Sequence, residues 1–91
     1  MLGELTMQMF TEEELGFARV EGIGSIAMVK RVRTRDPYDS WFVVDQVETC
    51  GGYRKRTTRT HCDMLLANTD YQKRLALMKA KWANTEVNEN V

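Results

Sequence analysis

Cysteine, histidine and proline are scarce in this chain of 91 residues, which has two, one and one of them. Two cysteines, Cys50 and Cys62, cannot build the disulfide framework of a small secreted domain. Together with His61 they supply at most three soft metal ligands, whereas a structural zinc site uses four in short paired spacings. We therefore expect no metal, no cofactor and reduced thiols, with Cys62 as an ordinary small apolar residue.

Long apolar runs are also missing from the sequence. No stretch approaches the ~18 apolar residues that suggest a membrane span. No charged start followed by an apolar run marks a signal peptide. We therefore expect a cytoplasmic protein that does not bind a membrane.

Catalytic motifs are absent as well. The glycines at positions 22 and 24 lack the third glycine of a dinucleotide-binding loop and the Lys-Ser/Thr pair of a phosphate loop. His61 and Cys62 are adjacent, and sequence neighbours rarely reach the geometry that an activated thiolate needs. We predict that the protein is not an enzyme.

The chain has no net charge, because thirteen basic residues balance thirteen acidic ones. This balance excludes a strongly basic nucleic-acid scavenger and an acidic mimic of DNA. The distribution is nevertheless uneven. Residues 1–29 contain one Arg and five Glu, whereas residues 30–59 contain eight Lys or Arg and four Asp or Glu. The middle of the chain is therefore a positive segment.

The segment after residue 10 has the signature of a helix start. Thr11 and Glu14 form a capping box, in which each side chain can bond the backbone amide of the other. Gly22 is a typical exit signal. These features predict a helix over residues 12–21, and the preceding residues 1–10 form either a short strand or a loose terminus.

Alternating polarity predicts two strands, over residues 25–35 and 40–49, and residues 53–60 are expected to return as a third strand. Residues 36–39, Asp-Pro-Tyr-Asp, have the chemistry of a turn. Gly51-Gly52 suits a tight hairpin, since glycine permits positive φ. The third segment is polar on both faces, which is typical of a strand at a sheet edge.

The last third of the chain predicts a helix from an apolar stripe at helical spacing. The stripe consists of Met64, Tyr71, Leu75, Met78 and Trp82. Capping chemistry around Asp70 leaves two interpretations open: a helical turn at 62–67 followed by a main helix at 70–83, or one continuous helix from 62. Residues 84–91 are expected to form a frayed tail.

Together these elements predict one α+β domain over residues 1–91. We expect a three-stranded antiparallel meander with an N-terminal helix and a longer C-terminal helix packed on the sheet. This order, with the second helix beginning near His61-Cys62-Asp63-Met64, is similar in outline to the double-stranded-RNA-binding domain. The basic sheet backed by a C-terminal helix is similar in outline to plant ethylene-response-factor and integrase arm-binding domains. The signature motifs of these families are absent here, and element order alone does not carry function.

The basic residues of the first and third predicted strands form the candidate binding site. Alternation places Arg31, Arg33 and Arg35 on one face, and Arg54 and Arg56 on one face of their own strand. If both rows point the same way, the sheet presents a positive plate suited to phosphate groups. The candidate nucleic-acid or anion contacts are Arg31, Arg33, Arg35, Arg54, Lys55, Arg56 and Arg59.

The alternative is a solvated face that neutralises itself. Asp45 and Glu48 on the central strand offer cross-strand partners to the arginines. Trp41 and Phe42 alternate, so both belong to a core only if both sheet faces are covered. Trp41 and Tyr53 are therefore candidate interaction anchors, since exposed Trp, Tyr and Arg dominate binding hot spots.

Two functions follow from these residues. The first is a small non-catalytic binding protein, a nucleic-acid-binding accessory protein that uses a basic β-sheet face. The second is a protein–protein interaction module or inhibitor, of the kind that mobile elements encode, which binds and modulates a larger protein. A homodimer formed through edge strands is compatible with either.

Overall fold

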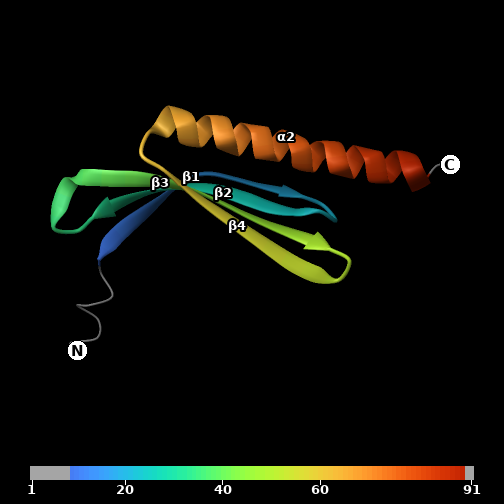
Figure 1. Ribbon diagram of the computed structural model, residues 1–91, viewed down its shortest axis with the longest axis horizontal. Coiled ribbons are helices and arrows are strands. Elements are labelled where there is room, and N and C mark those ends of the chain that lie inside the picture. Colours follow the sequence, from blue (N-terminus) through green and yellow to red (C-terminus); the bar gives the residue numbers. More distant parts are fainter. Residues whose placement is uncertain (1–8, 90–91) are drawn as a thin grey trace.

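The computed structural model describes residues 9–89, which form a four-stranded antiparallel sheet covered on one face by one helix (Figure 1). The strands are β1 (Phe10–Val20), β2 (Gly24–Arg33), β3 (Asp36–Cys50) and β4 (Tyr53–His61), and the helix is α2 (Met64–Glu89). The strand order β1-β2-β3-β4 is a simple meander, so β1 and β4 are the two edges. The predicted α+β class and the edge position of β4 are confirmed.

The first element is a strand and not the helix predicted over 12–21. β1 pairs with β2 along its length, and a bulge between Glu14 and Gly16 lets Leu15 join the core side of the sheet. The capping box is a local pattern. Pairing with β2 buries Val20 and satisfies the backbone of a whole strand, so tertiary context prevails over local helix signals. The order is thus four strands and one helix, which also removes the outline likeness to an RNA-binding domain.

The turns are partly as predicted. Gly51 and Gly52 connect β3 to β4 with φ of 57° and 87°, so both have the positive φ that a two-residue hairpin requires. The turn predicted at 36–39 is wrong, because β2 and β3 connect through residues 34–35. Pro37 lies instead within β3, next to a register shift, where the lost N–H is tolerated.

The core lies between α2 and one face of the sheet. Its buried members are Val20, Ile26, Met28, Phe42, Val44, Ala67, Tyr71 and Met78. Phe42 and Trp41 point to opposite faces, and only Phe42 lies beneath the helix. The helix is continuous, which favours the single-helix interpretation. It also extends to Glu89, so the frayed tail expected from residue 84 is wrong within the described residues.

The predicted helical stripe is confirmed in its centre and wrong at its ends. Tyr71 and Met78 are buried and Leu75 packs against them, whereas Met64 and Trp82 are 51% and 45% exposed. The C-terminal part of this long helix extends past the sheet, which leaves side chains near that end uncovered (Figure 1). Within residues 9–89, no helix has the length and apolar character needed to cross a lipid bilayer.

Gly16 lets the helix approach β1 closely. A Cβ built on Gly16 would lie 3.3 Å from Cζ of Tyr71, which is closer than nine in ten real Cβ contacts, so the Tyr71 ring would have to move by a few tenths of an ångström. The absence of a side chain at Gly16 lets the Tyr71 ring pack directly against the backbone of β1. Gly16 therefore has a packing role in β1.

A part-buried polar network also connects the helix to the sheet. Asp70 accepts a hydrogen bond from Arg74 at 2.8 Å and lies 2.9 Å from Nε2 of His61 on β4. Arg74 also donates to buried Gln46 on β3 at 2.8 Å. Burial of Asp70 raises the pKa of its carboxyl, but the hydrogen bonds from His61 and Arg74 outweigh it, so the net pKa shift is downward.

The packing face of α2 can be tested with two neighbouring residues. Met78→Ala should lower the free energy of unfolding by about 2–5 kcal/mol, because it leaves a cavity beneath the helix. Leu77→Ala, at a side chain that is 55% exposed, should change it by less than about 0.5 kcal/mol. Urea denaturation followed by circular dichroism measures both. Equal losses would contradict the placement of the helix.

The polar network predicts acid sensitivity. Because the pKa of Asp70 is lowered from its ordinary value of 3.8, the stability that its carboxylate contributes is present above that pH and is lost as the pH falls below it. Asp70→Asn should lower the free energy of unfolding by about 1–3 kcal/mol at neutral pH, since Arg74 and His61 lose their carboxylate partner. The difference in the free energy of unfolding between Asp70→Asn and the unaltered protein should shrink below pH ~3.8, where the Asp70 carboxylate becomes protonated.

The control for this experiment is Asp63→Asn, at an exposed residue. Asparagine also serves well at the start of a helix, so this change should have little effect. Thermal unfolding at a series of pH values compares the variants. A pH-independent difference between Asp70→Asn and the unaltered protein would show that the Asp70 carboxylate does not contribute through its charge.

Candidate nucleic-acid interface

The two predicted rows of arginines lie on the same face of the sheet. Arg31 pairs with Trp41 across β2 and β3, and Arg56 pairs with Val47 across β3 and β4. Cross-strand partners point to the same side, and Trp41 and Val47 share a side of β3 by alternation. This side is opposite to buried Phe42, so α2 does not cover it. We call it the open face.

The strands contribute to the open face as their registers require. Its members are Phe10, Glu12, Glu14, Phe17 and Arg19 of β1, Ser25, Ala27, Val29, Arg31 and Arg33 of β2, Trp41, Val43, Asp45, Val47 and Thr49 of β3, and Arg54, Arg56, Thr58 and Thr60 of β4.

The other predicted contacts lie elsewhere. Lys55 and Arg59 pair with Glu48 and Val44, so they are on the helix side of β4. Arg35 is in the turn between β2 and β3. The candidate site therefore keeps Arg31, Arg33, Arg54 and Arg56 and does not bring the other three into the same surface.

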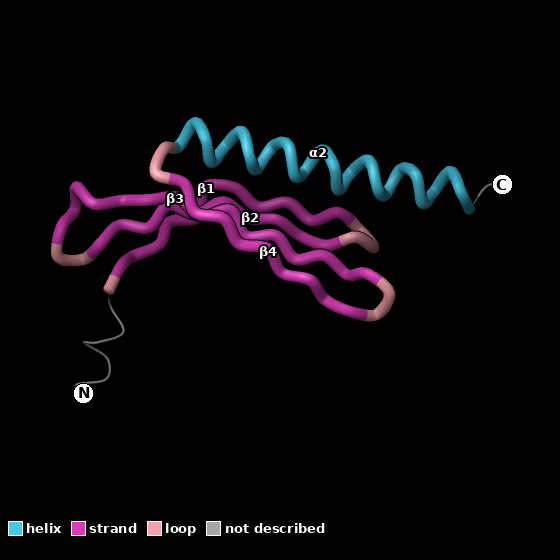
Figure 2. The backbone as a smooth tube through the Cα atoms, viewed as in Figure 1, coloured by secondary structure: helices cyan, strands magenta, loops and turns pink. Residues whose placement is uncertain are grey.

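The open face has two ends that differ in charge. One end lies toward the β2–β3 turn and the other toward the β1–β2 and β3–β4 turns (Figure 2). At the first end, Nε of Arg31 lies 2.6 Å from a carboxylate oxygen of Glu12, and Nε of Arg33 lies 2.7 Å from one of Asp39. Each arginine is thus neutralised by a carboxylate. We call this region the paired end.

Aromatic rings pack among these ion pairs. Phe10 and Trp41 meet edge to face with their ring centroids 5.7 Å apart. The Arg31 guanidinium lies 4.6 Å from the Phe10 centroid, and that of Arg33 lies 5.2 Å from the Trp41 centroid. Trp41 is therefore a half-buried part of a local cluster. Tyr53, the other predicted anchor, is 80% exposed beside the β3–β4 turn.

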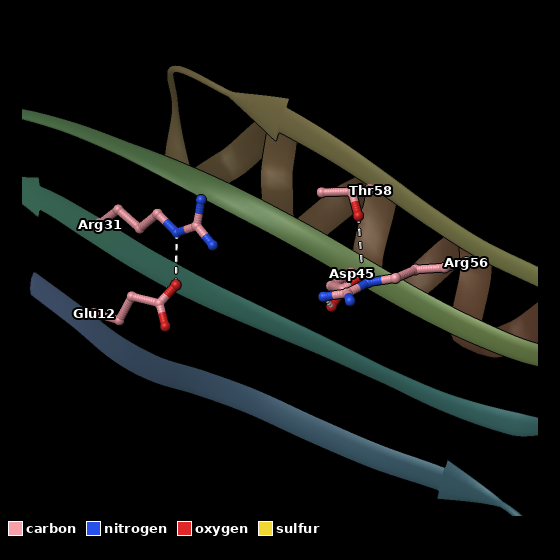
Figure 3. A network of polar contacts seen from close by, with 5 residues as sticks. All are labelled: Glu12, Arg31, Asp45, Arg56 and Thr58. Carbon is pink, nitrogen blue, oxygen red and sulfur yellow. Dashed lines mark hydrogen bonds and ion pairs between the residues drawn. The ribbon is translucent and has the colours of Figure 1, made fainter. Parts of the chain in front are cut away.

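Asp45 holds Arg56 in the middle of the open face (Figure 3). The guanidinium of Arg56 donates to both carboxylate oxygens at 3.0 and 2.7 Å, and the Thr58 hydroxyl donates to one of them at 3.0 Å. The hydrogen bond from Arg56 is the main cause that lowers the pKa of Asp45. The side chain of Arg56 is 70% exposed, so the pair is open to solvent and contributes little to stability.

Beyond Asp45, the open face is hollowed. The hollow has a volume of about 340 Å³ and is lined by Phe17, Arg19, Gly24, Ser25, Val47, Thr49 and Arg54. Within residues 9–89, neither Arg19 nor Arg54 has an ion-pair partner. The unneutralised positive charge of the open face therefore lies here, and we call this region the hollow end.

Sequence reasoning missed two residues of the hollow end, Phe17 and Arg19, because it assigned them to a helix. The sequence Phe17-Ala18-Arg19-Val20 does alternate. In a strand it places Ala18 and Val20 toward the core and the other two outside, as observed. The alternation was too short to outweigh the capping box that precedes it.

The soft ligands do not come together. In the part of the chain that the structure describes, no group of three or more His, Cys, Asp or Glu side chains is placed to hold a metal ion. His61 bonds to Asp70, and Cys62 is exposed between β4 and α2. The expectation that Cys62 packs as a small apolar residue is wrong, because the chain leaves the sheet at that point.

Similarity to known proteins does not assign the chain to a family. Comparisons with protein families, with curated proteins and with solved structures found no match. The functional argument therefore depends on the chemistry of the open face.

Proposed function

We propose that this protein is a small non-catalytic nucleic-acid-binding protein that contacts its ligand through the open face. The observation that carries the proposal is the pair Arg19 and Arg54, which line one hollow without a carboxylate partner among the described residues. Arginine binds phosphate through paired, charge-assisted hydrogen bonds. Phosphate contacts are the main source of affinity for nucleic acids.

The hydroxyl groups of the open face support the same ligand. Ser25 and Thr49 line the hollow together with the arginines. Thr58 and Thr60 continue this polar surface along β4. Arginine, serine and threonine side chains are among the groups that donate hydrogen bonds to phosphate oxygens in nucleic-acid complexes.

The balanced composition limits the affinity. Thirteen basic and thirteen acidic residues leave no long-range attraction from net charge, so binding must come from local contacts. Affinity should therefore be modest and should weaken steeply with salt, by a slope that counts the phosphates contacted. This behaviour suits an accessory protein better than a tight binder.

A pair of neighbouring charge reversals tests the open face. Arg54→Glu should abolish binding, or weaken it at least tenfold, because it removes a phosphate contact and adds repulsion. Lys55→Glu makes the same change of charge one residue away, on the helix side of β4, and should have a much smaller effect. Fluorescence anisotropy with labelled single- and double-stranded DNA and RNA, at low and physiological salt, measures both.

Three outcomes separate the hypotheses. Loss of nucleic-acid binding in Arg54→Glu but not in Lys55→Glu supports the open face as the binding surface. Equal losses would indicate unspecific attraction to a basic protein. Absence of binding by the unaltered protein to every polymer at low salt would reject the proposal and favour a protein partner.

Removal of one carboxylate should have the opposite effect. Asp45→Asn frees Arg56 from its bidentate partner and adds one positive charge to the open face. We expect tighter binding, about three- to tenfold at low salt, and a salt slope steeper by roughly one phosphate contact. The same anisotropy assay measures it, with Asp63→Asn as the control. Unchanged affinity would mean that Arg56 does not face the ligand.

A protein partner is the second candidate function, and one observation favours it. Met64, Leu65 and Leu66 at the start of α2 are 51%, 69% and 55% exposed. Adjacent exposed apolar side chains are typical of protein interaction sites. This surface lies on the helix, apart from the open face. Under this hypothesis Arg54→Glu would leave the interaction intact, and Leu65→Ser with Leu66→Ser would disrupt it.

A further inference from the structure

We infer that the hollow end holds one nucleotide of a single-stranded nucleic acid, with its base against Phe17 and its phosphate between Arg19 and Arg54. This inference rests on the proposed function and makes it specific: it selects single strands over duplexes. It is carried by the lining of the hollow, which combines an exposed ring, two arginines and two hydroxyls.

The two arginines approach the hollow from opposite edges of the sheet. Arg19 is on β1 and Arg54 is on β4, with β2 and β3 between them. Three strand spacings, roughly 14 Å, separate the two strands. Arg54 is also offset by two residues from Arg56, which lies in the cross-strand row of Arg19. Both side chains line the same hollow, so they reach inward over the two central strands. Such a pair can hold an anion between them, above the hydroxyls of Ser25 and Thr49.

Phe17 supplies the surface for a base. Its side chain is 57% exposed, and in the described part of the chain it has no aromatic or cation–π partner, unlike Phe10 and Trp41 at the paired end. Its cross-strand neighbour is Ala27, which is too small to cover the ring. An apolar ring left open next to two arginines suits a ligand that is flat and apolar on one side and anionic on the other.

The geometry favours an unpaired base. In a duplex the faces of the bases are stacked on one another and cannot reach a ring in a hollow, whereas a single strand can turn its bases outward. A hollow of about 340 Å³ is at the lower end of the range for small-ligand sites, so one nucleotide is an appropriate occupant. Stacking on exposed aromatic rings along a basic surface is how many proteins bind single strands without sequence preference.

Three labelled probes separate the base from the phosphate: an oligothymidine, an abasic strand of the same length, and a duplex of the same length. We expect the unaltered protein to bind the oligothymidine most tightly. Phe17→Ala should weaken that binding by about 5- to 140-fold, the range measured when a stacking ring is replaced by alanine. It should leave the affinity for the abasic strand and the duplex unchanged, because the arginines remain.

Two further variants control for folding and for ring chemistry. Phe17→Trp should retain tight oligothymidine binding, because the larger ring also stacks. Tyr38→Ala removes a ring that is 95% exposed near the β2–β3 turn, away from the hollow, and should have no effect. Circular dichroism confirms that each variant is folded. Thymidine monophosphate as a competitor shows whether a free nucleotide is sufficient to occupy the hollow.

The outcomes also separate this inference from the proposed function. If the unaltered protein binds all three polymers equally and Phe17→Ala changes nothing, the inference is overturned and the proposed function stands. If binding of the oligothymidine and the abasic strand falls together in Phe17→Ala, Phe17 has only a structural role and the inference is again overturned. If no polymer binds at low salt, both proposals fail. Thymidine monophosphate should compete at lower concentrations than inorganic phosphate, because it carries both the base and the phosphate. Equal competition by the two would show that the base does not contribute and would overturn the inference.

Discussion

Packing of α2 on Ile26, Val44 and their neighbours is the contact on which the rest of the structure depends. One helix can cover only one face of a four-stranded sheet, and side chains alternate between the two faces along each strand except at the bulges. Once Met78 and Tyr71 lie against that face, every side chain of opposite parity must remain on the other side. A shift of one residue in any strand would exchange the two sets. The arginines of the open face are therefore positioned by the burial of residues that they do not contact.

Part of the open face is shielded from solvent although no helix covers it. Val43 is 2% exposed although it points away from α2. Val29 and Thr60 flank it across the strands. Long charged side chains can cover apolar surface with their stems while their charged groups stay in water. Water is partly excluded from such a covered apolar surface, and this strengthens electrostatic contacts made next to it.

Much of this arrangement could be predicted from the sequence, and the errors have physical causes. β2, β3 and β4 were found because Val-rich alternation and Gly51-Gly52 are strong local signals. The register then placed Arg31 and Arg56 on one face, which alternation in separate strands could not decide. β1 was mistaken for a helix because Thr11 and Glu14 imitate a cap, while the pairing that makes it a strand depends on residues far away in the chain. That error removed Phe17 and Arg19 from the candidate site, since in a helix they would not share a face with Arg54.

The ion pairs of the open face set an order among its arginines. Arg31, Arg33 and Arg56 each have a carboxylate partner, so a phosphate must replace an existing contact to bind them. Exposed ion pairs of this kind contribute only about 0–1 kcal/mol to stability. Replacement of the carboxylate by a phosphate therefore costs little free energy, but it also adds little to the affinity. Arg19 and Arg54 have no such competitor among residues 9–89, and a phosphate gains the full interaction there. Under the proposed function, the first contacts should therefore form at the hollow end, and the paired arginines should follow only when a longer strand extends across the sheet toward Trp41.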